Sequence, residues 1–142
     1  AWGNFPFVGT AETRERASLF HPWVGEHRLL ERVTATEEFQ KIYRARLEEM
    51  LTKFFLPDRL NRRIDEVAAA IRSAVAAESE LRLSRFDQAV SGKVLPRWEG
   101  DPFDPTRTAH QLKRFIQARA KNAREQLDGH SKGLLLERQQ PQ

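Results

Sequence analysis

Hydrophobic residues recur every three or four positions along two long stretches of this chain. Between residues 37 and 54 the apolar positions are Phe39, Ile42, Tyr43, Leu47, Met50, Leu51 and Phe54. Between residues 57 and 75 they are Leu60, Ile64, Val67, Ala68, Ile71 and Val75. This spacing places them on one face of an α-helix. The pattern therefore predicts two amphipathic helices that meet at Pro57.

The junction between these two helices is predicted to be a tight corner. The residue before a proline avoids helical geometry, whereas proline itself is tolerated in the first turn of a helix. We therefore expect Phe54 and Leu60 to be buried at this corner. The two helices should pack as an antiparallel or steeply angled pair. Thr34 and Glu37 have the spacing of a capping box, which predicts the start of the first helix.

Three shorter patterns complete the predicted secondary structure. His27, Leu29, Leu30 and Val33 form a short helical stripe over residues 26–33. Ser84 can cap a helix that Gly92 ends, and a last helix opens near Asp104-Pro105, ends at Leu127 and is stopped by Gly129. Because no stretch alternates as a strand would, the predicted fold class is all-α, with four to five helices.

The first 25 residues have a different composition. They combine glycines and prolines with Trp2, Phe5, Phe7, Phe20 and Trp23. Gly and Pro break regular structure, and large aromatic side chains need burial. We expect an irregular segment over 1–25 that packs on the following helices or on another part of the protein. Residues 26–128 would form a helical module, and residues 129–142 a frayed tail.

Composition excludes several classes of protein. The chain has 142 residues, 39% hydrophobic and 31% charged, which suits one globular domain. It has no cysteine, and this excludes disulfides, thiol nucleophiles and thiolate metal sites. No apolar run approaches the roughly 18 residues of a membrane-spanning helix. We therefore expect a soluble helical module.

The positive charge is concentrated at the C-terminal end. The net charge is +4, and residues 105–142 alone hold 8 basic and 3 acidic side chains. The basic residues of the predicted last helix are Arg107, Lys113, Arg114, Arg119, Lys121 and Arg124. Helical geometry spreads them around the non-core surface, which suits solubility as well as phosphate contact. We interpret them as a solvated face, and nucleic-acid binding is the less favoured alternative.

Candidate catalytic and metal-binding patterns are few. The four histidines, at positions 21, 27, 110 and 130, lack the spacing of a helical zinc site. Glu99, Asp101 and Asp104 could bind a hard cation, although the two Asp-Pro steps are more simply read as turns. Ser91-Gly92-Lys93 lacks the flanking residues of a phosphate loop. We predict no catalytic, cofactor-binding or metal-binding residue in this chain.

A series of short motifs runs through most of the chain from His21 to Gly133. They are His21-Pro22-Trp23 with Leu29-Leu30, Thr36-Glu37-Glu38-Phe39 with Tyr43, Arg44 and Leu47, Phe55-Leu56-Pro57-Asp58-Arg59-Leu60, Ile64-Asp65, Ser84-Arg85-Phe86-Asp87, and Lys113-Arg114-Phe115-Ile116 through Arg119 to Leu127. Each motif is largely helix-core patterning. In their order, they resemble the C-terminal part of bacterial spore-coat-protein-H-like (CotH) kinases.

This resemblance implies a part of an ATP-dependent atypical protein kinase. Ala1-Trp2-Gly3-Asn4 resembles the segment that directly follows the family's metal-binding aspartate. ATP and Mg²⁺ are implied for the full-length family member. Its nucleotide-binding lobe, lysine and catalytic acid would lie upstream of this chain. Since phosphoryl transfer needs a positioned Mg²⁺–nucleotide complex, we expect this chain alone to be inactive.

The resemblance also implies partners and a location. The partners would be the rest of the kinase domain and a protein substrate. The location would be a bacterial extracytoplasmic setting or the spore surface. The alternative is a self-contained helical protein-interaction module, for which the aromatic residues of 1–25 should all be buried against the chain's own helices.

Overall fold

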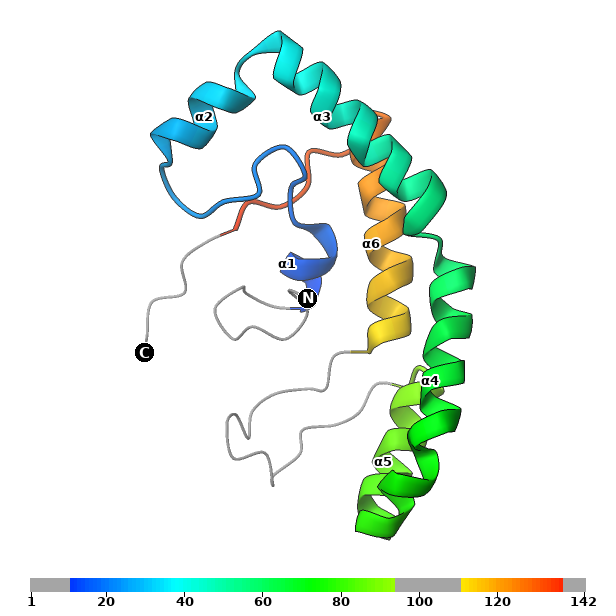
Figure 1. Ribbon diagram of the computed structural model, residues 1–142. Helices are drawn as coiled ribbons and strands as arrows, with labels where there is room; N and C mark the ends of the chain where they lie inside the picture. The colour runs from blue at the N-terminus through cyan, green and yellow to red at the C-terminus, as the bar shows by residue number, and fades with distance from the viewer. Residues whose placement is uncertain (1–10, 94–110, 137–142) are drawn as a thin grey trace. The chain divides into compact units, whose positions relative to one another are not determined.

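The computed structural model describes residues 11–93 and 111–136, and within them the chain is all-α (Figure 1). These residues form six α-helices and one π-helix. The elements are α1 (Ala11–Arg16), α2 (Arg28–Thr34), α3 (Glu37–Glu49), the π-helix η1 (Met50–Phe54), α4 (Pro57–Glu78), α5 (Glu80–Val90) and α6 (Leu112–Leu127). The all-α prediction is confirmed. The helix count exceeds the four to five predicted, because α1 lies in the segment expected to be irregular.

The chain divides into two compact units. Unit 1 comprises Ala1–Leu56 and Gln117–Gln142, and unit 2 comprises Pro57–Ile116. Unit 2 is thus an insertion between the two parts of unit 1. In the described ranges, no helix is both long and apolar enough to cross a membrane.

In unit 1 the chain segments at the two ends are joined by backbone pairing. Ala17 pairs with Leu134 and Val24 with Leu136, both in parallel orientation. The amide of Ser18 donates to the carbonyl of Leu134 at 2.8 Å. The amide of Leu134 donates to the carbonyl of Arg16 at 2.7 Å. The expectation of a frayed tail is therefore wrong for residues up to 136, whereas residues 137–142 lie outside the described part.

Helix α3 begins two residues later than the predicted capping box implies. Its N-cap is Thr36, which makes no side-chain capping hydrogen bond. Thr34 is still the last residue of α2, and its hydroxyl donates to the Leu30 carbonyl at 2.7 Å. The capping box of Thr34 and Glu37 is therefore wrong, because the Thr34 hydroxyl already closes the preceding helix.

Helix α3 continues into η1 by widening its turn. The amide of Phe55 donates to the carbonyl of Met50, five residues earlier, at 2.7 Å. This is the hydrogen-bond spacing of a π-helix. The predicted helix over 37–54 is thus continuous, and its last turn is a π-helix instead of an α-helix.

Unit 2 contains a hairpin of two helices, α4 and α5. Ser79 alone links them, and its hydroxyl accepts from the Arg82 amide at 3.2 Å as the N-cap of α5. Arg72 donates to both carboxylate oxygens of Asp87, at 2.9 and 2.7 Å, across the hairpin. The predicted Ser84 cap is wrong. Ser79 stands earlier in the extended conformation that a capping residue adopts.

The predicted burial of the corner at Pro57 is only partly correct. Phe54 is 62% exposed, so its predicted burial is wrong, and Leu60 is half-buried. On the same face of the helix, the ring of Phe20 contacts Tyr43 edge-on and partly shields it from solvent. The side chain of Phe54, further along this face, remains exposed. Leu56 and Pro57 belong to different units, so the packing of the helices on either side stays a prediction.

The aromatic N-terminal segment is partly enclosed by the chain itself. Trp23 is 8% exposed and Phe20 is half-buried. Trp2, Phe5 and Phe7 lie outside the described residues. The predicted start of the last helix at Asp104-Pro105 also lies outside them, whereas its end at Leu127, followed by Gly129, is confirmed.

Candidate functional site

Side chains from α3 and α6 hold the loop over residues 17–23 in place. The Tyr43 hydroxyl donates to the Leu19 carbonyl at 2.8 Å. The Arg119 guanidinium donates to the Ala17 carbonyl. Because polar backbone groups removed from water need partners, these bonds allow an irregular segment to pass through the interior of unit 1.

Gln126 binds this loop through both atoms of its side-chain amide. Its amide oxygen accepts from the Leu19 amide at 2.8 Å, and its Nε2 donates to Ala17 O at 3.2 Å and to Asn122 Oδ1 at 2.7 Å. The side chain is 2% exposed. Gln126 is therefore a buried polar group whose donor and acceptor both have partners, as a buried amide requires.

Arg44 links α3 to the end of α6. Its guanidinium donates to the carbonyl of Leu127 at 2.7 Å and lies 5.0 Å from the ring centroid of Phe20. A cation at a helix C-terminus meets the negative end of the helix dipole, and a guanidinium over an aromatic face is attracted to it. Arg44 thus fixes both the helix end and the Phe20 ring.

Burial perturbs the two ionisable groups beside this loop. Desolvation raises the pKa of the Tyr43 hydroxyl, an effect that the positive charge of Arg119 partly opposes. Desolvation likewise lowers the pKa of Arg119, and Tyr43 opposes that change. Near neutral pH, Tyr43 is therefore an uncharged hydrogen-bond donor and serves to position the loop.

A cavity of about 650 Å³ lies between this loop, α2 and α3. Its apolar walls are formed by Phe20, Pro22, Trp23, Leu30, Phe39 and Tyr43. The rings of Phe39 and Tyr43 are stacked with their centroids 5.6 Å apart. The ring centroids of His21 and Trp23 are 4.1 Å apart. This volume is within the range of small-ligand pockets, and the ring contacts preform its walls.

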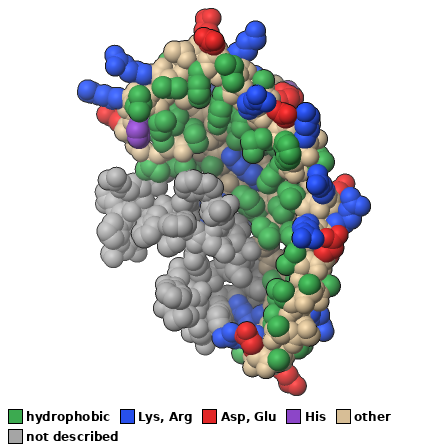
Figure 2. Space-filling model, in the orientation of Figure 1, with side chains coloured by type: hydrophobic (Ala, Val, Ile, Leu, Met, Phe, Trp, Pro, Cys, Tyr) green, Lys and Arg blue, Asp and Glu red, His purple; other side chains and the backbone are tan. Residues whose placement is uncertain are grey.

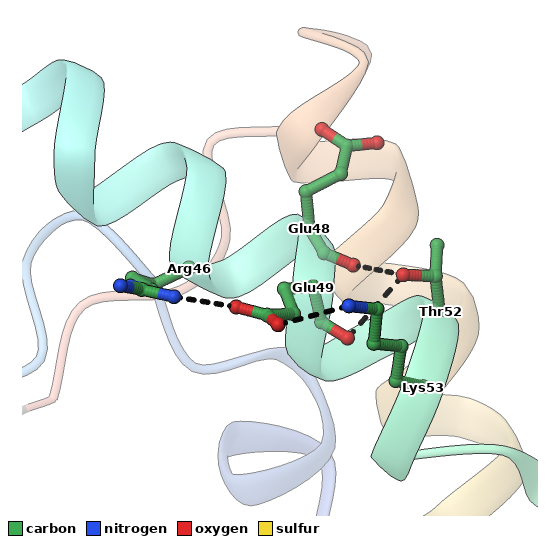
Figure 3. A network of polar contacts seen from close by, with 5 residues as sticks. All are labelled: Arg46, Glu48, Glu49, Thr52 and Lys53. Carbon is green, nitrogen blue, oxygen red and sulfur yellow. Dashed lines mark hydrogen bonds and ion pairs between the residues drawn. The ribbon is translucent and has the colours of Figure 1, made fainter.

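A polar network covers the outer surface where α3 passes into η1 (Figure 3). Glu49 accepts from Arg46 at 2.7 Å and from Lys53 at 3.0 Å. The Thr52 hydroxyl donates to the carbonyl of Glu48 at 2.8 Å. The hydrogen bond from Arg46, followed by that from Lys53, lowers the pKa of Glu49. This exposed network joins neighbouring turns of the same helical segment and has the character of a surface ion-pair network.

Most of the predicted basic face of the last helix is used within the chain. Lys113 pairs with Asp65 at 2.6 Å, and Arg124 pairs with Glu48 at 2.7 Å. Lys121 lies 4.0 Å from Glu125, and Arg119 is turned inward to Ala17. Arg107 lies outside the described residues. These pairings are those of a charged helix surface, from which Arg119 is an exception, and nucleic-acid binding stays the less favoured alternative.

Among residues 11–93 and 111–136, no three His, Asp or Glu side chains gather as metal ligands would. Glu99, Asp101, Asp104 and His110 lie outside this part of the chain. Ser91-Gly92-Lys93 forms the turn that follows α5, where the Lys93 amide donates to the Gln88 carbonyl at 3.1 Å. The absence of a catalytic or metal site in the chain therefore stays a prediction.

Sequence reasoning missed the residues that hold the loop. The sequence places Arg119 on the basic surface of the last helix and in one of the family-like motifs, and it gives Gln126 no role. A signal was present: Asn122 and Gln126 stand four residues apart, next to the apolar positions Ala123 and Leu127 of the same helix. Polar side chains beside an apolar stripe can indicate buried hydrogen bonds to a neighbouring segment.

A comparison with known protein families gives a match over most of the chain. The family described as CotH kinase protein matches residues 8–123, which is most of the chain. No curated protein and no solved structure matches it. The matched range includes most of the ordered motifs that begin at His21. The chain therefore belongs to the CotH kinase family.

Proposed function

We propose that this chain is the helical C-terminal portion of the large lobe of a CotH-like atypical protein kinase, and that it is inactive alone. Membership of the CotH kinase family supports the link to a kinase. By resemblance, the nucleotide-binding lobe, its lysine and the catalytic acid belong to an upstream part, which would hold ATP and Mg²⁺. The role of the helical portion is to complete the large lobe and to present a protein substrate.

The observation that carries this proposal is an uncovered apolar stripe on α3 and η1. Phe39, Tyr43 and Leu47 are half-buried, but Met50 and Phe54 on the same face are 54% and 62% exposed. Figure 2 shows hydrophobic side chains at the surface over α2 and α3, among charged ones. Exposed apolar residues that continue a core stripe are typical of a surface that another protein part covers.

The surroundings of this stripe also suit a permanent interface. On the neighbouring surface, Arg46 and Lys53 both pair with Glu49. A covering element could bury Phe54 without breaking these two ion pairs. Burying a phenylalanine side chain contributes about 1.5–3 kcal/mol. Interfaces between permanently associated protein chains are apolar and resemble the core of a domain cut in half.

The test combines nucleotide binding with association. Calorimetry with Mg²⁺–ATP should detect no binding to this chain alone, and binding at micromolar affinity would contradict the proposal. When the chain is co-expressed with the upstream kinase part, the two should co-purify. The double variant Met50→Ser, Phe54→Ser should weaken this association at least ten-fold. The matched control is Leu81→Ser, which changes another exposed apolar residue, in unit 2.

One observation favours the alternative of a self-contained interaction module. Trp23 is buried and Phe20 packs on Tyr43 within the chain itself. A self-contained module would not associate with the upstream kinase part, whether or not Met50 and Phe54 are replaced. The co-purification experiment therefore separates the two functions.

A further inference from the structure

We propose that the outer surface of α2 and the start of α3 binds the same surface of a second copy of this chain. We call this surface the α2–α3 patch. Its residues, all exposed, are Arg28, Leu29, Arg32, Val33, Glu37, Glu38 and Ile42. The patch belongs to unit 1 and is separate from the stripe at Met50 and Phe54. The inference therefore does not rest on the proposed function.

Helical geometry places the patch away from the cavity of unit 1 and away from the apolar stripe. Leu30 of α2 and Tyr43 of α3 line the cavity, and Tyr43 also belongs to the stripe. Successive residues of an α-helix are turned by about 100°. Leu29 therefore lies on a different face of α2 from Leu30, and Ile42 on a different face of α3 from Tyr43.

The apolar side chains of the patch have little cover from the chain itself. Leu29 is 68% exposed, Ile42 55% and Val33 39%. Helix α2 contains no buried residue, and an isolated helix of this length is marginal in water. Hydrophobic side chains are visible at the surface over α2 and α3, among charged ones (Figure 2). Clustered exposed apolar residues with a polar rim are typical of protein-interaction surfaces.

The basic half of the patch is not explained by the stability of α2. Arg28 and Arg32 stand one turn apart, where like charges repel each other. Neither forms an ion pair with any residue in the described ranges. Arg28 is also the first residue of α2, where a positive charge opposes the helix dipole. A negatively charged partner surface would relieve both effects.

The acidic half of the patch provides such a partner in a second copy. Glu37 and Glu38 occupy the first turn of α3 and, within the part of the chain that the structure describes, form no ion pair. In a twofold-symmetric dimer the same patch meets itself, so α2 of each copy faces α3 of the other. Both copies then contribute two arginines and two glutamates to complementary contacts.

This charge arrangement favours a second copy over other partners. A patch of one sign would repel its own copy, whereas halves of opposite sign attract each other twice. An anionic membrane would be attracted by Arg28 and Arg32 but repelled by Glu37 and Glu38. An acidic peptide would leave the glutamates without partners.

Lys41 limits the strength of this association. It is exposed, lies on the same side of α3 as Glu37 and Glu38, and forms no ion pair within the described residues. Its positive charge opposes the arginines of the approaching copy. We therefore expect a weak dimer, and Lys41→Glu should strengthen it several-fold.

Sedimentation velocity of the full 142-residue chain measures the association. The parent should pass from monomer to dimer in a concentration series up to about 1 mM, which populates even a weak dimer. Added salt should weaken this dimer, since exposed charges are screened. The double variants Arg28→Glu, Arg32→Glu and Glu37→Lys, Glu38→Lys should each dimerise about ten-fold more weakly or less, because like charges then face each other.

Mixing the two double variants is the decisive step. One variant is acidic on both helices and the other basic on both, so their heterodimer has opposite charges at both contacts. The equimolar mixture should therefore dimerise as well as the parent. Because a misfolded protein could not be restored in this way, restoration also shows that both variants are folded.

The apolar contribution is tested with serine variants. Leu29→Ser, Ile42→Ser should weaken the dimer several-fold, whereas Met50→Ser, Phe54→Ser should leave it unchanged. Circular dichroism monitors helicity in each protein. If a charge variant loses helicity, the pair Leu29→Ser, Ile42→Ser decides, and an unchanged dimer then contradicts the inference.

Three further results would overturn the inference. They are a monomer at every concentration, a dimer lost on replacing Met50 and Phe54, and no restoration on mixing two folded charge variants. None of these measurements involves nucleotide or the upstream kinase part. Failure of this inference is therefore distinguishable from failure of the proposed function.

Discussion

Gly133 lies directly against Gln126: a β-carbon at position 133 would stand 2.7 Å from Nε2 of Gln126 and 2.6 Å from Cα of Ser18. The same glycine has a φ of +71°, in the left-handed region. The tail after α6 and the loop over residues 17–23 can therefore approach each other only where no side chain intervenes.

Gly133→Ala should consequently be strongly destabilising. We expect a loss of about 2–4 kcal/mol, since left-handed strain of about 1–2 kcal/mol is joined by a clash with backbone that cannot move aside. The control is Gly129→Ala, which has a φ of +80° but open space around it and should show the strain alone. Chemical denaturation measures both, and equal losses would mean that the close approach is not formed.

Ser79→Ala should destabilise unit 2, because it removes the N-cap of α5. The expected loss is about 1 kcal/mol, the typical value for such a cap. Ser84→Ala is the matched control, since Ser84 lies inside α5 and should change stability by less than about 0.5 kcal/mol. A larger effect at Ser84 than at Ser79 would restore the cap originally predicted.

Phe54→Ala should cost less than about 1 kcal/mol in this chain, since the side chain is already exposed. A buried phenylalanine at the corner would cost about 3–5 kcal/mol. Leu127→Ala, at a buried position of the same unit, provides the comparison and should cost about 2–5 kcal/mol. Thermal melts of the three proteins decide between an exposed stripe and a buried corner.

Stability should depend on the ionisation of Tyr43 at alkaline pH. Burial raises the pKa of this hydroxyl above its ordinary value of 10.0. The unfolded chain then loses the proton first. The stabilising contribution is therefore complete below about pH 10 and is lost as the pH rises through the raised pKa.

Tyr43→Phe tests this dependence. The variant should be less stable than the parent by about 1 kcal/mol at pH 8, because the Leu19 carbonyl loses its donor. The difference should shrink above pH 10. Tyr43 is also the one tyrosine of the chain, so tyrosinate absorbance reports its ionisation directly. A titration midpoint at or below 10.0 would contradict the burial.

The helices were predictable from sequence because their signals are local. The three- and four-residue spacing located α3 and α4, and Gly129 marked the end of α6. Caps were less predictable. Thr34 and Ser84 each satisfy a capping pattern, but Thr36 and Ser79 are the residues at which the backbone leaves the extended conformation.

The contacts around the candidate site depend on distant parts of the chain and leave no local pattern. Tyr43 was correctly placed on an apolar face, but its bond to Leu19 joins residues that no periodicity relates. The burial of Phe54 was predicted wrongly for a related reason. Amphipathic spacing shows that one face of a helix is apolar. It does not show whether another segment of the same chain packs against that face.

The pairing of Ala17 with Leu134 has a consequence for the order of folding. The two residues are 117 positions apart, so this contact forms only after nearly all of the described chain has left the ribosome. The hairpin of α4 and α5 needs only neighbouring residues and is free to form earlier. During synthesis, the loop after α1 is present before its partners in α6 and in the tail around Leu134 have been made. The protection that this pairing gives to the loop thus begins only after Leu134 has emerged from the ribosome.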